Sequence, residues 1–151
     1  MLKRLLVPFV FLFFLFQVSS LLAQSSDQYF EQARNAAFQD KNYAEAIDLA
    51  KKGLDLAPEY TELRLFLGKV YFWSNNYANA RSTLKKILDE NSSHTDARLT
   101  LIDLELETEN YNRALVLANT GLDHHSTNTE FLFRKGKALE QMANNDAAIQ
   151  Q

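Results

Sequence analysis

The sequence predicts an all-α fold in which helical hairpins stack side by side into a solenoid. An Asn-Tyr dipeptide recurs every 34 residues, at 42–43, 76–77 and 110–111, and an alanine follows each tyrosine by three residues. Sequence repeats of about this length are typical of arrays of helix pairs. Thr61, Thr95 and Thr129 recur at the same interval, each followed by an acidic residue. These observations predict three full repeats and a truncated fourth.

Apolar residues within each repeat recur at the three- and four-residue spacing of a helix with one buried face. In the second repeat this stripe contains Leu63, Phe66, Leu67, Val70 and Tyr71. The predicted helices are 27–40, 43–57, 61–74, 77–91, 95–108, 111–124 and 129–142, with a further helix starting near 145. The repeats therefore lie near 27–60, 61–94, 95–128 and 129–151, the last of them incomplete, in one domain over 24–151.

Residues at the repeat boundaries predict how the helices begin and pack. The hydroxyls of Thr61, Thr95 and Thr129 are expected to accept a hydrogen bond from a first-turn amide, and the acid after each lies near the positive end of the helix dipole. Asn76 suits the cap of the second helix in its pair. Two glycines, Gly68 and Gly136, are expected where helices approach closely.

The first 23 residues differ in kind from the rest and predict a secretory signal peptide. Lys3 and Arg4 give a basic start, 5–16 is apolar throughout, and 17–23 ends in polar and small residues, so cleavage is expected after Ala23. The alternative is an uncleaved membrane anchor, because the apolar span with Leu21 and Leu22 approaches the length that a bilayer requires. The signal peptide therefore predicts export across the inner membrane into the periplasm, and association with the outer membrane is implied only by a family resemblance of the repeats.

Composition excludes several classes of function. Without Lys3 and Arg4, 14 basic residues stand against 19 acidic ones, a net charge of −5 with no basic run, so nucleic acid is an unsuitable ligand. The chain contains no cysteine, which rules out disulfides, thiolate chemistry and a lipoprotein anchor. The three histidines, His94, His124 and His125, fall in turns between repeats without the spacing of a metal site. We therefore expect no enzyme activity, no cofactor and no metal.

One stretch of the second repeat resembles a known family. Arg64-x-x-Leu67-Gly68-x-x-Tyr71, followed by Ala80 and Leu84, resembles the tetratricopeptide repeat signature. The signature's first aromatic residue is replaced by arginine here and again at Arg98. The resemblance covers about 27–151 and implies a solenoid whose first helices line a concave, partner-binding face.

A narrower resemblance concerns 64–73, the Asn-Tyr pair at 76–77 and residues 101–105. These segments resemble the periplasmic repeat segment that precedes the β-barrel in YaiO-type outer-membrane proteins. The resemblance implies a barrel beyond Gln151, so that the membrane would be met only through the signal segment or through that absent barrel.

The resulting functional hypothesis is an exported scaffold that binds a protein or peptide on its concave face. The alternative is a periplasmic structural appendage of an outer-membrane barrel or polysaccharide-export machine. The carboxylate clamp of chaperone-binding relatives is disfavoured, because Glu31 stands where a lysine is needed and only Asn35 matches. The predicted partner-binding residues are Leu65, Lys69, Phe72, Trp73, Leu99, Asp103, Phe133 and Lys137.

Two of these residues carry an alternative role. Trp73 is as well suited to packing between repeats as to binding, and Phe72 is better suited to the core.

Overall fold

The computed structural model describes residues 24–149, with side chains as far as Asn144, and this part of the chain is entirely helical apart from its turns. The helices are α2 (Ser26–Phe38), α3 (Tyr43–Leu56), α4 (Thr61–Trp73), α5 (Tyr77–Glu90), α6 (Thr95–Glu107), α7 (Tyr111–His124) and α8 (Thr129–Ile149). The predicted signal peptide, 1–23, lies outside the described residues. Within them, no helix has both the length and the hydropathy needed to cross a bilayer.

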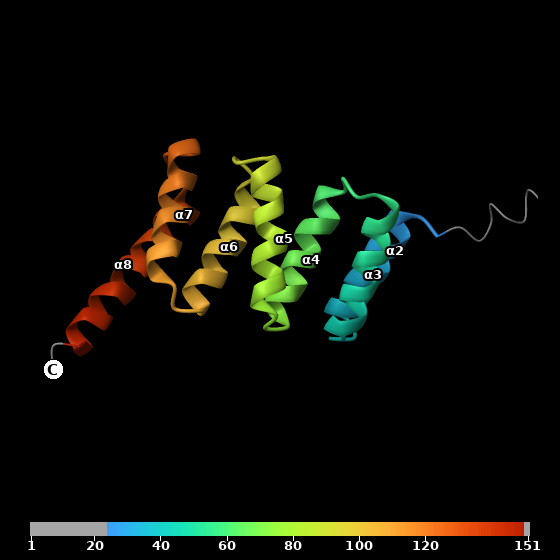
Figure 1. Ribbon diagram of the computed structural model, residues 1–151, viewed down its shortest axis with the longest axis horizontal. Coiled ribbons are helices and arrows are strands. Elements are labelled where there is room, and N and C mark those ends of the chain that lie inside the picture. Colours follow the sequence, from blue (N-terminus) through green and yellow to red (C-terminus); the bar gives the residue numbers. More distant parts are fainter. Residues whose placement is uncertain (1–23, 150–151) are drawn as a thin grey trace, which may run out of the picture.

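The helices pack as a row of antiparallel hairpins, each helix lying mainly against its neighbours in the chain (Figure 1). Contacts between α4 and α6 and between α6 and α8 also join the first helices of successive repeats in one layer. This arrangement confirms the predicted all-α solenoid of helical hairpins.

The predicted threonine caps are wrong, because each N-cap lies one residue earlier. Tyr60 and His94 precede α4 and α6; the ring Nδ1 of His94 accepts from the Ala97 amide, whereas Tyr60 makes no side-chain cap bond. Ahead of α8, the Asn128 side chain accepts from the amides of residues 130 and 131. Each threonine is instead the first helical residue, where its hydroxyl no longer reaches the free first-turn amides.

The two helices of each complete repeat are joined through a residue in the left-handed conformation. Lys41, Asn75 and Glu109 occupy this position with φ of 55°, 59° and 59°. Asn76, predicted to cap α5, is at the N-cap but makes no side-chain cap bond. In the first repeat Asn42 does cap, accepting from the Glu45 amide at 3.2 Å.

The fourth repeat departs from the prediction, because no second helix starts near 145 and α8 instead continues to Ile149. The residue at the phase of the left-handed position is Ala143, and alanine strongly favours a right-handed helix over the left-handed conformation. The tyrosine that begins each second helix is replaced by Asn145. The signals that end the first helix in the other repeats are thus missing here.

Glycines mark close contacts between helices, although not at both predicted positions. A Cβ on Gly68 would lie 2.8 Å from Leu84 Cδ2, so the buried Leu84 side chain would have to shift to make room for it. At Gly136 the described residues form no such contact, since none of their atoms lies within 4 Å of an added Cβ. Gly121, not singled out in the sequence, accommodates the ring of Phe131, whose atoms would lie 2.7 Å from an added Cβ.

The arginines that replace the signature's aromatic residue close the turn before their own helix. Arg64 and Arg98 are 4% and 5% exposed, and their guanidinium groups donate to the backbone oxygens of Pro58 and Ser92 respectively. These two acceptors stand at the same phase of the repeat. The substitution therefore exchanges an apolar contact for a hydrogen bond and leaves the fold intact.

Candidate functional site

Four of the predicted binding residues lie on α4 and two on α6. These first helices share one surface with α2 and α8, which we call the concave face. Its α4 part carries Leu65, Lys69, Phe72 and Trp73, and its α6 part carries Leu99 and Asp103. Positions 65, 99 and 133 stand at one phase of the repeat, so the predicted row of apolar side chains follows directly from the repeat period.

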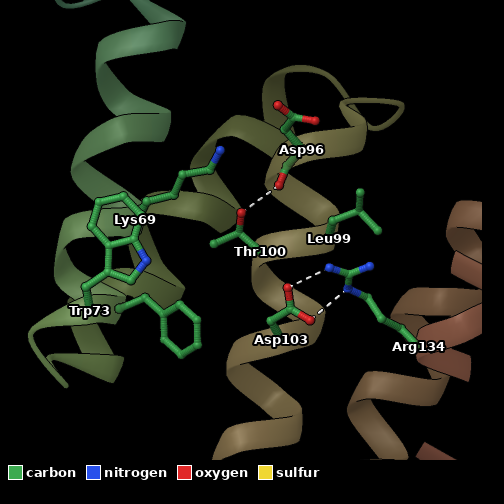
Figure 2. A pocket seen from close by; sticks show the side chains of 8 residues that line it. Lys69, Trp73, Asp96, Leu99, Thr100, Asp103 and Arg134 are labelled. Carbon is green, nitrogen blue, oxygen red and sulfur yellow. Dashed lines mark hydrogen bonds and ion pairs between the residues drawn. The ribbon is translucent and has the colours of Figure 1, made fainter. Parts of the chain in front are cut away.

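Two neighbouring cavities open on the concave face and meet at Lys69 and Trp73. The first, of 380 Å³, lies between α2 and α4 and is also lined by Leu65, Phe30, Phe38 and other residues. The second, of 330 Å³, is lined by residues of α4, α6 and α8, including Leu99 and Asp103. Figure 2 shows Lys69 and Trp73 on α4 facing the side chains that project from α6. The structure thus brings together Leu65, Lys69, Phe72, Trp73, Leu99 and Asp103.

Trp73 packs between repeats, one of the two roles that the sequence left open, and its binding role stays a prediction. Its ring lies 5.4 Å from that of Phe38, 6.3 Å from that of Tyr43 and 6.4 Å from that of Phe66, so it packs mainly against the preceding repeat. It nevertheless remains 38% exposed and lines both cavities. Phe72 is likewise partly buried, with its ring 6.1 Å from Tyr77, and contacts the second cavity.

Asp103 is held by a residue that the sequence analysis did not single out. Arg134 of α8 donates from Nε to Oδ1 at 2.7 Å and from Nη2 to Oδ2 at 2.9 Å, a bidentate pair that crosses the concave face (Figure 2). Hydrogen bonding to Asp103 raises the pKa of the Arg134 guanidinium, and Glu130 contributes a second carboxylate at 2.6 Å. The signal in the sequence was weak, because an arginine four residues after a glutamate on a helix usually forms only a surface pair.

The two predicted residues on α8 stay apart from both cavities. Phe133 is 68% exposed and Lys137 is also exposed, and neither lines the cavities described. Leu106 of α6 is buried in one cluster with Ile102 and takes no part in this surface. The usable surface is therefore centred on α4 and α6.

The concave face offers apolar cavities with charged groups beside them. In the part of the chain that the structure describes, no three His, Asp or Glu side chains converge as metal ligands would. The polar groups at the second cavity are Lys69, the Asp103–Arg134 pair, Asp96 and Thr100, whose hydroxyl donates to the Asp96 backbone oxygen at 2.8 Å. Such a surface can hold apolar side chains and place a cation, Lys69, and a carboxylate, Asp96, beside them.

Several solved structures share this architecture. The first tetratricopeptide repeat domain of Spaghetti (RPAP3), bound to the HSP90 peptide SRMEEVD, is 24% identical over 80% of this chain and 97% of that one, with a TM-score of 0.68. The corresponding domain of Sgt2 from Aspergillus fumigatus is 18% identical over 81% and 82%, with a TM-score of 0.70. A tetratricopeptide repeat protein from Parabacteroides merdae is 18% identical over 81% and 48%, with a TM-score of 0.72.

At these identities the likeness concerns the fold. No curated protein matches the chain. Residues 37–98 and 74–131 match the family model described as tetratricopeptide repeat, which together covers more than half of the sequence. The chain therefore belongs to the tetratricopeptide repeat family.

Proposed function

We propose that the protein is an interaction scaffold that binds an extended segment of a protein partner on its concave face. The observation that carries the proposal is the pair of cavities joined at Lys69 and Trp73, which together extend from α2 to α8. A partly exposed tryptophan between two hollows is the kind of rigid aromatic anchor that dominates binding energy at interfaces. The peptide seen on the RPAP3 domain supports this use of the fold.

The charges indicate what the partner segment carries. Among the described residues Lys69 makes no ion pair, and neither does Asp96 on the α6 side of the second cavity, whereas Asp103 is already neutralised by Arg134 at 2.7 Å. A segment with apolar side chains for the two hollows and an acidic residue near Lys69 is complementary to this surface. Capture of a terminal carboxylate by the chaperone-type clamp is not expected, since Glu31 pairs with Arg34 at 3.9 Å where the clamp needs a lysine.

Binding is tested by selecting peptides from a displayed library on the purified chain and measuring their affinity for matched variants. Lys69→Glu reverses the charge between the cavities and should weaken binding about tenfold or more. Lys86→Glu makes the same change on the exposed surface of α5 and should leave the affinity within about twofold. Equal affinities for the two variants, with unchanged unfolding midpoints, would move the binding surface away from Lys69.

We also propose a localisation. The protein is exported and serves an outer-membrane or polysaccharide-export assembly. The basic start, the apolar run and Ala23 support export, and the resemblance of 64–77 and 101–105 to YaiO-type repeat segments supports the assembly role. Intact-mass spectrometry of the product should give a chain that begins at Gln24. A full-length mass recovered only from membranes would contradict cleavage.

A further inference from the structure

A third cavity, of 450 Å³, lies between the second helices α5 and α7, with α6 beneath it. None of its lining residues lines either concave cavity. Its walls are mainly apolar, formed by Leu88, Leu101, Val116 and Leu117, and Val116 is 64% exposed although it is a large aliphatic residue. This volume lies within the range of small-molecule sites, about 300–1,000 Å³.

The preceding repeat shows what is particular about this cavity. Val116 and Leu117 of α7 correspond, 34 residues earlier, to Ser82 and Thr83 of α5. The two leucines are unchanged in type, because Leu54 and Leu67 stand at the equivalent positions. Of the four apolar positions, only the two on α7 are polar in the preceding repeat. The cavity is therefore more apolar than its counterpart on the α7 side alone.

The second difference is a buried arginine without a carboxylate. Arg64 donates to Glu90 Oε2 at 2.6 Å, but the residue at the phase of Glu90 in the next repeat is His124. Arg98 consequently has no acidic partner within ion-pair distance in the part of the chain that the structure describes, and it keeps only the Ser92 backbone oxygen. Burial lowers the pKa of its guanidinium, as expected for a cation that lacks compensation.

Other charges at the cavity add to this positive character. Lys85 and Arg113 line it together with a single acidic residue, Asp89. Arg113 replaces the uncharged Asn79 of the preceding repeat, and it also lies 3.8 Å from Glu105, whose carboxylate is already bidentate with Arg81. Three cations against one anion, next to an apolar wall, favour a ligand with a negative group on a hydrocarbon body.

We propose that this cavity binds a small amphiphile in which an aliphatic chain carries a carboxylate. The carboxylate supplies to Arg98 the partner that Glu90 supplies to Arg64, and the chain lies on Val116, Leu117 and the two leucines. The size of the cavity and its separation from the concave face set this site apart from the protein-binding surface. Occupation of both sites at once is possible, because they share no residue.

The probe is decanoate, titrated calorimetrically into the full chain, with two variants that leave the fold intact. His124→Glu gives Arg98 its own carboxylate, and Val116→Glu places a negative charge on the apolar wall; each should weaken binding about tenfold or more. Ser82→Glu, at the position equivalent to Val116 in the preceding repeat, is the matched control and should bind decanoate as the unchanged chain does. Unfolding midpoints of all three variants verify that folding is retained.

Each alternative result overturns part of the proposal. Decanol that binds as tightly as decanoate would show that the carboxylate is not recognised. Acetate that binds as tightly as decanoate would show that the apolar wall does not contribute to binding. Unchanged affinity in both His124→Glu and Val116→Glu would place the ligand elsewhere. A short apolar peptide with a free C-terminal carboxylate that binds more tightly than decanoate would show that the site recognises a peptide terminus and not a small amphiphile.

Discussion

The junctions between successive repeats use one backbone frame but different chemistry. Between the first two repeats, Ile47 and Tyr71 belong to one apolar cluster, which aromatic rings from α2 and α4, tilted against one another, extend. At the same two phases in the next junction stand Arg81 and Glu105, joined by bonds of 2.7 and 3.0 Å. The repeat period thus determines which positions meet between two repeats. The residue types at those positions determine how the contact is stabilised and how much stability a substitution removes.

The two kinds of junction differ most in what a single substitution leaves behind. Truncating an apolar residue leaves a cavity, with a cost that depends on how far the neighbours relax. Removing one member of a buried ion pair leaves the other charged and desolvated, although the intact pair adds little net stability. Glu105 is fully buried, so the ionic junction is the more sensitive of the two to loss of one partner.

The largest expected effect comes from Glu105→Ala, which strands Arg81 in the ionic junction. The free energy of unfolding should fall by about 2–4 kcal/mol, less than for a fully buried pair because the Arg81 side chain is 26% exposed. Chemical denaturation measures the loss. Arg113→Ala removes a more distant and mainly exposed cation beside the same carboxylate and should cost under about 0.5 kcal/mol. A comparable loss in both variants would mean that Arg81 and Glu105 do not form a discrete pair.

Trp73→Ala tests the aromatic junction and should cost about 2 kcal/mol. This value lies below the usual range for a buried tryptophan because 38% of the residue is exposed. Phe133→Ala is the control, because that ring is 68% exposed and should contribute under about 0.5 kcal/mol. Denaturation curves that coincide for Trp73→Ala and the unchanged chain would remove Trp73 from the junction and leave it a purely binding residue.

Exchanging one junction for the other tests whether the frame is shared. The double variant Arg81→Ile with Glu105→Tyr copies the first junction's pair into the second. Because replacing a whole ion pair with packed apolar side chains is often neutral or stabilising, the unfolding free energy should stay within about 1 kcal/mol of the original. A loss as large as that of Glu105→Ala alone would show that the two junctions differ in backbone and not only in side chains.

The smallest expected effect concerns the left-handed turn residue that the repeats share. Glu109→Gly should stabilise the chain by about 0.5–1 kcal/mol, because glycine adopts a φ of 59° without a Cβ clash. Asn75→Gly should change stability much less, since asparagine tolerates this conformation. Thermal unfolding of the two variants provides the measurement, and destabilisation by Glu109→Gly would contradict a common turn geometry.

The order and pairing of the helices could be predicted from sequence because a 34-residue period repeats the same local signals. Details that depend on one residue were less accessible. The continuation of α8 past residue 145 depends on Ala143 standing at the left-handed position, whose importance is visible only once Lys41, Asn75 and Glu109 are seen to share it. The N-caps were predicted one residue too late for a similar reason. Each threonine and the residue before it both lie at the helix start, and the sequence does not show which of the two is the cap.

The concave face could be predicted in part. Residues at one phase, such as Leu65 and Leu99, follow the repeat and line the cavities, while their part in binding stays a prediction. Ion pairs between repeats were not foreseen, because Arg81, Glu105 and Arg134 each resemble surface residues when only their own helix is considered. The third cavity also escaped notice, since it depends on side chains from three helices.

Site-specific photocrosslinking in the producing cells tests the central claim, that the concave face is the partner-binding surface. A photoreactive residue is placed at Leu99, on the wall of the second cavity, and in a separate variant at Lys86, on the exposed surface of α5. The account predicts a discrete crosslinked partner from position 99 that is absent from position 86 and is lost when Lys69→Glu is added. The same partner crosslinked from position 86 and not from position 99 would contradict it.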